Sequence, residues 1–237
     1  MNLFKTLGCV VILCDPLAGF AQDLQDTVIH LRDVEVRASR IRNFSSGNKT
    51  EVLDSSLLSL YPGNNLADVL NSQSQVFIKS YGQGSLATTS FRGAGASHTA
   101  VLWNGFNLQN SMNGTLDMAL VPSFFLSNVQ LQYGGSGALW GSGAVGGTVY
   151  MNNAASFNKG ISCMLNSSLG SFSDNQQQGG IELSKKKFIT SLKLFKHTAK
   201  NDFPFVNTAQ YGNVQQKQTH AGLEHTGLLQ ENYFLIN

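Results

Sequence analysis

The fold is decided by the stretch from residue 90 to residue 153, SFRGAGASHTAVLWNGFNLQNSMNGTLDMALVPSFFLSNVQLQYGGSGALWGSGAVGGTVYMNN. Its charged residues are one cation, Arg92, and one anion, Asp117. Short runs rich in β-branched and aromatic residues alternate with Gly, Asn and Ser, a pattern typical of strands joined by turns. The predicted strands are Thr99–Trp103, Val129–Tyr133 and Thr148–Met151. A nearly uncharged, loop-rich α/β unit of this kind suits an enclosed position.

The end of this stretch, residues 134–147, is extremely rich in glycine. We expect irregular backbone there, because each glycine inside a helix costs about 1 kcal/mol relative to alanine. Residues 141–146 also match G-x-G-x-x-G, the pattern of a dinucleotide-binding loop. Such a loop must be followed by a helix, whereas Gly147–Met151 is typical of a strand, and no acidic residue follows within about twenty positions. The pattern therefore does not indicate a nucleotide site.

The spaced motifs SFRG, VLWNG and SGALWGSGAVGGTVYM resemble the plug domain of TonB-dependent outer-membrane receptors. In the cobalamin-receptor branch, the most similar one, the pattern is roughly S-I-R-G, then V-L-I-D-G, then S-A-L-Y-G-x-x-A-I-G-G-V-I-N-I. The resemblance covers residues 34–153 and keeps the motifs in order. It implies an α+β fold, in which a small plug domain with a mixed β-sheet and short helices precedes the antiparallel strands of a β-barrel.

The resemblance also implies a function. A receptor of this family would take up a scarce nutrient across the outer membrane of a Gram-negative bacterium, with energy from the periplasmic protein TonB and no chemistry performed. Cobalamin is the first candidate ligand, and a siderophore or a glycan is the alternative. A secreted, plug-like binding module without transport is the alternative from another functional class.

Composition agrees with an exported β protein. The chain has 237 residues, a formal net charge of +2 and a charged fraction of 13%, so it lacks the basic character of a nucleic-acid-binding protein. Gly, Ser, Asn and Gln take the place of charges, as tight turns and uncharged polar surfaces require. No catalytic constellation and no Cys/His cluster with metal-ligand spacing stands out, and we expect neither enzyme activity nor a cofactor.

The first 21 residues are typical of a secretory signal peptide. Lys5 provides the positive charge, Leu7–Leu13 the apolar core, and Gly19-Phe20-Ala21 the small-x-small cleavage site before Gln22. A membrane anchor is disfavoured because the apolar core is too short to span a bilayer. A lipoprotein signal at Cys14 is disfavoured because Leu13 stands where a small residue is expected. After cleavage Cys163 alone remains, so we expect no intrachain disulfide.

Residues 22–33 form a polar segment that we interpret as an exposed tail. The next residues alternate apolar and charged side chains, which predicts an extended strand. By resemblance this is the TonB box, which would bind TonB by adding a strand to it. Its residues are Asp33, Val34, Glu35, Val36, Arg37 and Ala38. A plain edge strand is the alternative.

Between this segment and residue 126, local signals predict several short elements. Asp54 and Asn65 are typical helix N-caps, for helices over residues 55–60 and 66–70. Asn104-Gly105 is the strongest signal for a two-residue hairpin turn. Pro122 suits the first turn of a short helix ending at Leu126. Further strands are expected at 49–53, at 76–81 and entering at Ser90-Phe91.

Residues 160–237 have the imperfect apolar/polar alternation of membrane barrel strands, which a soluble sandwich would share. We expect a polar turn at 184–187, a loop at 201–213, a strand at 215–229 and the start of a new strand at Phe234. Plugged transporters have 22 strands. Four strands and part of a fifth cannot close such a barrel, so the sequence is interpreted as a fragment with a truncated barrel that does not transport by itself.

The resemblance assigns further roles. Arg92 would contact the barrel wall, although the family's nearby Glu and Arg are replaced here by Gln130 and Tyr133 and its Pro by Gly135. The alternative for Arg92 is bonding to local carbonyls. The loops at 82–87 and 107–114 would face the ligand, and ordinary solvated turns are the alternative. Their candidate ligand-binding residues are Gln83, Ser85, Asn107, Gln109, Asn110, Met112 and Asn113. These side chains carry no charge, which favours a neutral, bulky ligand over an anionic iron chelate.

Overall fold

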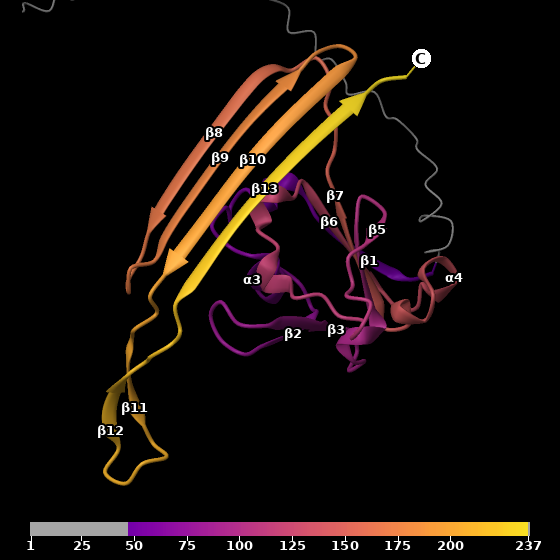
Figure 1. Cartoon of the computed structure of the whole chain (residues 1–237). Helices are drawn as coiled ribbons and strands as arrows, with labels where there is room; N and C mark the ends of the chain where they lie inside the picture. Colours follow the sequence, from indigo (N-terminus) through magenta and orange to yellow (C-terminus); the bar gives the residue numbers. More distant parts are fainter. Residues whose placement is uncertain (1–46, 237) are drawn as a thin grey trace, which may run out of the picture. The chain divides into compact units, whose positions relative to one another are not determined.

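The computed structural model describes residues 47–236, which belong to one compact unit of the chain. The predicted signal peptide, the polar tail and the TonB box at 33–38 lie outside the described residues. Two parts follow one another: an α/β module, residues 47–153, and a C-terminal sheet of four long strands (Figure 1). No helix among residues 47–236 is long and apolar enough to cross a membrane.

A five-stranded mixed sheet forms the centre of the α/β module. Its order is β1 (Lys49–Leu53), β6 (Asn128–Tyr133), β7 (Gly147–Asn152), β4 (Thr99–Trp103) and β5 (Phe106–Asn107). β4 and β7 are parallel, and the other pairs are antiparallel. Asn104 and Gly105 both have positive φ, at 47° and 88°, so the predicted hairpin turn between β4 and β5 is confirmed. A separate hairpin pairs β2 (Phe77–Ser80) with β3 (Ala87–Ser90).

Helices and turns cover the sheet. The side chains of Asp54 and Asn65 accept the capping hydrogen bonds of α2 (Ser55–Leu58) and α3 (Leu66–Gln73), as predicted. One face of α3 is fully buried and packs with Val129, Leu131 and Val149 of the sheet in a single apolar core. The remaining helical turns are short: η1 (Ala96–His98), η2 (Met118–Leu120), η3 (Ser123–Phe125), α4 (Gly137–Trp140) and η4 (Ser142–Ala144).

Several predicted boundaries were wrong. α2 is shorter than expected and α3 is longer: the polar residues 71–73 continue α3 beyond its apolar stripe, and Ser72 Oγ donates to the carbonyl of Asp68 at 3.0 Å. The strand expected to begin at Ser90 instead ends there. The glycine-rich segment contains the one-turn helix α4, although helix was excluded there. Its side chains Leu139 and Trp140 are partly buried, and Trp140 donates a hydrogen bond to Tyr150, so tertiary contacts outweigh the helix cost of glycine.

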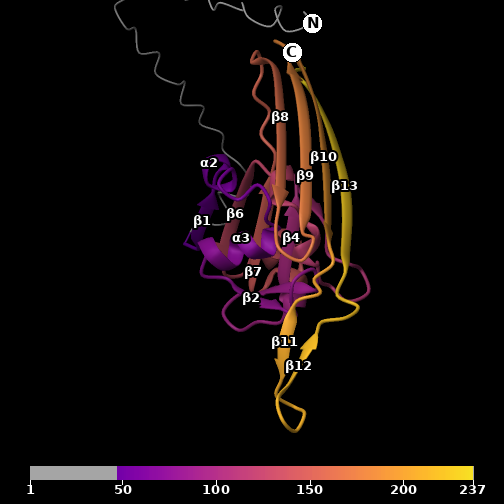
Figure 2. The ribbon, with the colours of Figure 1, turned by 90° about the vertical axis from the view of Figure 1, so that its left-hand side faces the viewer.

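The C-terminal sheet is an antiparallel meander of β8 (Gly160–Leu169), β9 (Asn175–Ser184), β10 (Phe188–Ala199) and β13 (Leu223–Phe234) (Figures 1 and 2). A small hairpin, β11 (Pro204–Asn207) and β12 (Val214–Lys217), is inserted between β10 and β13. The single strand predicted at 215–229 is therefore two strands. His220, with a positive φ of 58°, lies in the break between them. Phe234 ends β13 and does not begin a further strand.

Register divides the side chains of this sheet between two faces. On β13, exposure alternates strictly along the strand. The face toward the α/β module carries mainly polar and small residues, among them Gln178, Gly180, Ser191 and Glu231. The opposite face carries exposed apolar side chains of all four strands: Ile161, Leu165, Leu169, Ile181, Leu194, Leu228 and Phe234.

Candidate functional site

Two phenylalanines attach the α/β module to the C-terminal sheet. Phe124 and Phe125 follow Pro122 in η3, are buried, and pack with Phe195 of β10. The rings of Phe125 and Phe195 meet edge to face, with centroids 6.4 Å apart. Two glycines of the sheet make room for them. A Cβ at Gly227 would lie 3.0 Å from Phe125 Cε2, and one at Gly180 would lie 3.4 Å from Phe124 Cζ.

Polar bonds surround this aromatic contact. Lys193 Nζ, on β10, donates to the backbone carbonyls of Phe124 at 3.3 Å and Phe125 at 3.4 Å. The side-chain amide of Asn153, just after β7, donates to both carboxylate oxygens of Glu231, at 2.9 Å each. Tyr233 OH donates to Glu231 Oε1 at 2.9 Å. The module is therefore held against β10 and β13 by hydrogen bonds as well as by packing.

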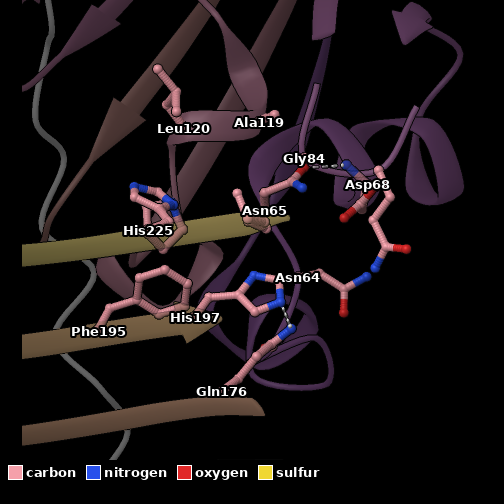
Figure 3. Close-up of a pocket in the computed structure, with 14 residues that line it drawn as sticks. Asn64, Asn65, Asp68, Gly84, Ala119, Leu120, Gln176, Phe195, His197 and His225 are labelled. Carbon is pink, nitrogen blue, oxygen red and sulfur yellow. Dashed lines mark hydrogen bonds between the residues drawn. The ribbon is translucent and has the colours of Figure 1, made fainter. Parts of the chain in front are cut away.

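A cavity of about 230 Å³ lies between the module and the sheet (Figure 3). Its polar lining combines His197 and His225 of the sheet with Asn64, Asn65 and Asp68 of the module. In Figure 3 the two imidazoles project from neighbouring strands, and the register makes them direct cross-strand partners. His197 Nε2 lies 3.2 Å from Asp174 Oδ1 and 3.4 Å from Gln176 Nε2. The cavity therefore offers several hydrogen-bonding groups from both parts of the chain.

His197 and His225 could not be connected from the sequence, because they are far apart in the chain and their pairing depends on the register of β10 with β13. Gln83 and Gly84, from the first predicted ligand loop, also line the cavity. Ser85 is exposed in the same loop, and its backbone N–H donates to the carbonyl of Gly82 at 3.1 Å. The structure thus brings Gln83 beside the histidines.

The second predicted loop, residues 107–114, is shaped by its own amides. Gln109 Nε2 donates to the carbonyls of Thr99 at 3.0 Å and Gly114 at 2.6 Å. Asn107 Oδ1 accepts from Gln109 N, Asn110 Oδ1 from Met112 N, and Asn113 Oδ1 from Thr115 N. Met112, by contrast, is 97% exposed at the loop tip. Gln109 also lines a surface hollow of about 530 Å³ with His98 and Val145. The ligand-binding role of this loop stays a prediction.

Arg92 is exposed, with a positive φ of 51°, and the predicted contact with a barrel wall stays a prediction. Tyr133, which replaces the family's arginine, is buried and donates from its hydroxyl to Glu51 Oε2 at 2.7 Å. Burial, together with this bond and the charge of Glu51, raises the pKa of Tyr133 to about 12. The missing cation is therefore replaced by a neutral phenol that bonds within the module.

Comparison with known proteins agrees with this architecture. Residues 42–148 match the family model described as the TonB-dependent Receptor Plug Domain. The chain is 26% identical over 136 residues to the vitamin B12 transporter BtuB of Vibrio vulnificus, a match that covers 55% of this chain and 21% of that protein. The chain thus spans about a fifth of that relative.

Solved receptors share the fold. The FrpB iron transporter of Neisseria meningitidis superposes with a TM-score of 0.60 at 14% identity, over 81% of this chain and 30% of that one. The ferric yersiniabactin uptake receptor FyuA of Yersinia pestis gives 0.55 at 18% identity, over 76% and 27%. The family match thus identifies residues 42–148 as a TonB-dependent receptor plug domain, and the mixed sheet and the antiparallel strands that follow it agree with the fold of these receptors.

Proposed function

We propose that this chain acts in the outer membrane as the plug and the first wall strands of a receptor that imports a scarce nutrient with energy from TonB. The observation that carries the proposal is the division of the C-terminal sheet into a polar face toward the plug and an exposed apolar face on the other side. Barrel strands in outer membranes alternate in this way, with apolar residues toward lipid. The family match over the plug supports the same role.

In this proposal the ligand binds at the loops around Gln83 and Asn107–Gly114 and is neutral. The polar residues of both loops are amides and hydroxyls, and Met112 is the most exposed apolar group in them. Cobalamin is the preferred ligand because of this uncharged surface and the similarity to a vitamin B12 transporter. A siderophore is the alternative, supported by the fold shared with iron receptors.

Ligand occupancy would then favour release of the segment 33–38, which would pair with TonB as an added strand. A titration of the exported chain with the purified periplasmic domain of TonB tests this directly. We expect binding that Val36→Pro abolishes, because proline removes a backbone N–H needed for strand pairing. Val28→Pro is the matched control and should bind normally. Normal binding by Val36→Pro would overturn the assignment of 33–38, and loss of binding in Val28→Pro would move it to residues 26–31.

The ligand is tested separately. Titrating the chain with cyanocobalamin and with a ferric siderophore, followed by tryptophan fluorescence, should show saturable binding of cyanocobalamin. The paired variant Gln83→Ala with Met112→Ala should weaken that binding at least tenfold. Binding of the siderophore alone would replace cobalamin as the proposed ligand.

A further inference from the structure

Four lysines gather at one end of the C-terminal sheet. Lys185, Lys186 and Lys187 form the turn between β9 and β10, and Lys159 precedes β8 beside them. All four are exposed, and together with Ser184 and Phe188 they border a surface hollow of about 890 Å³. No acidic side chain lines this hollow, and none of the four lysines forms an ion pair with another residue of the range 47–236. We call this group the lysine rim.

The backbone holds the lysine rim in place. Lys185 N donates to the carbonyl of Phe188 at 2.8 Å, which closes the turn. Asn158 N donates to the carbonyl of Lys185 at 3.1 Å, and Leu235 N donates to that of Lys187 at 3.0 Å. Three chain segments are thus joined at this end of the sheet, and the four positive charges are held close together before any partner binds.

Aromatic and apolar side chains continue from the lysine rim along the outer face of the sheet. Phe188 and Phe234 are cross-strand partners on that face, with ring centroids 5.0 Å apart. Beyond them lie exposed apolar residues, including Ile181, Leu194 and Leu228. Along the outer face, lysines are followed by aromatic rings and then by aliphatic side chains. This spatial order matches the headgroups, the interface and the hydrocarbon core of a bilayer.

The connections at the two ends of the sheet differ in length, and this difference indicates which membrane leaflet the lysine rim faces. At the lysine rim the strands are joined by a tight turn, whereas at the opposite end β10 and β13 are joined by a long connection that contains β11 and β12 (Figures 1 and 2). Outer-membrane proteins have short turns on the periplasmic side and longer loops outside. The lysine rim would therefore face the periplasmic leaflet, which consists of phospholipid.

We propose that the lysine rim binds the phosphate groups of anionic phospholipids in that leaflet. The proposal rests on the proposed membrane function of the sheet and adds a lipid site to it. Ammonium groups attract anionic headgroups, and each lysine near such a surface contributes about a fivefold gain in binding. The lysine rim continues into the aromatic pair and the apolar outer face. A lipid would contact all of these, whereas a soluble phosphorylated partner would need the lysines alone.

Flotation of the full chain with vesicles tests the proposal. The vesicles are pure phosphatidylcholine or phosphatidylcholine with one fifth phosphatidylglycerol, at low and high salt. The variant Lys185→Gln, Lys186→Gln, Lys187→Gln removes three charges from the lysine rim. The matched control, Lys196→Gln, Lys200→Gln, Lys217→Gln, removes three exposed charges toward the opposite end. We expect the anionic lipid to strengthen vesicle binding by the parent and by the control. In the rim variant this strengthening should be smaller by a factor on the order of a hundred.

Three other outcomes count against the proposal. Equal binding to both vesicles by the parent would overturn the lipid site while leaving membrane association intact. An equal loss in the rim variant and the control would reduce the effect to net charge and would also overturn it. A chain that floats with neither vesicle would overturn the membrane role of the sheet, whereas the TonB titration tests the segment 33–38 independently of the membrane. Recovery of the gain by Lys185→Arg, Lys186→Arg, Lys187→Arg would confirm that positive charge is what the site requires.

Discussion

The side-chain amide of Asn153 donates hydrogen bonds to both carboxylate oxygens of Glu231, at 2.9 Å each, across 78 positions of the chain. The same amide donates to the carbonyl of Phe125 at 3.1 Å, and Asn153 Oδ1 accepts from Ser127 N at 3.0 Å. One residue at the end of β7 thus connects the plug sheet, the aromatic contact and β13. Any movement of the plug away from β13 must break these bonds.

Replacing Asn153 by alanine should loosen this junction. Hydrogen bonds to charged groups contribute about 1.5–3 kcal/mol each, and Glu231 would lose its main donor. We expect the free energy of unfolding to fall by about 2 kcal/mol, measured by urea denaturation. Protease cleavage in the linker at 154–159 should also become faster.

Asn232→Ala is the matched control, because Asn232 is the next residue on β13 and is exposed on the opposite face. Its free energy of unfolding should stay within about 0.5 kcal/mol of the parent's. Equal stability of the Asn153 and Asn232 variants would show that the bonds to Glu231 add nothing to the folded state.

Glycine at position 147 should be irreplaceable. A Cβ there would lie 2.6 Å from Phe91 Cγ and 2.8 Å from the backbone oxygen of Gln132. Since both the ring and the strand are buried, we expect Gly147→Ala to destabilise the plug by about 2 kcal/mol or more, measured by thermal unfolding. Gly137→Ala, where a Cβ would meet nothing within 4 Å, is the control and should be neutral or slightly stabilising. Similar melting temperatures for the two variants would contradict the tight packing.

Local chemistry explains which elements were predictable. The caps at Asp54 and Asn65 and the turn at Asn104-Gly105 depend on bonds and dihedral angles within a few residues, and all three were predicted. The three strands predicted within residues 90–153 were also found, because their apolar runs are bounded by strong turn residues. The break between β12 and β13 was missed, although Gly222, two residues after His220, is a residue type that interrupts strands.

The contacts between plug and sheet could not be predicted, because they depend on register between distant strands. Nothing near Lys193 in sequence indicates that it donates to the carbonyls of Phe124 and Phe125. For the loop amides the sequence did support a prediction, but the structure does not test it. Asn110 and Asn113 were predicted to face a ligand because the family resemblance turns their loop toward it, and the structure shows that the side-chain oxygen of each accepts a hydrogen bond from a nearby backbone N–H. Their ligand role therefore needs measurement.

The stability of the plug should decline in alkali through Tyr133. Burial and Glu51 raise the pKa of Tyr133 to about 12, so the folded state favours the neutral phenol. The stabilisation that this raised pKa provides is fully present below about pH 10, the ordinary pKa of tyrosine. It is lost as the pH rises from there toward 12. Tyr133→Phe should abolish this alkaline component. The difference in phenolate absorbance between the parent and Tyr133→Phe should be centred near pH 12, and a midpoint near 10 would contradict the buried bond to Glu51.

Docking of the plug should depend on the absence of a side chain at residue 227. A Cβ at this position would already lie 3.0 Å and 3.1 Å from Phe125 Cε2 and Cζ. The branched side chain of Gly227→Val would force Phe125 out of its contact with Phe195, at a cost of about 1–3 kcal/mol. Trp103 packs against this aromatic cluster, whereas Trp140 bonds to Tyr150 within the plug. The fluorescence of Trp103, isolated in a Trp140→Phe background, should therefore shift.

A double-mutant cycle separates this clash from a general weakening of β13. Phe125→Ala removes the ring that the valine would strike, so Gly227→Val should cost less in that background, with a coupling of about 0.5–3 kcal/mol. Thr226→Val is the matched control, because Thr226 lies on the exposed face of the same strand and valine suits a strand. It should leave stability and Trp103 fluorescence unchanged. Additive effects of Gly227→Val and Phe125→Ala would mean that the two residues do not meet, and that the plug is docked on the sheet in another way.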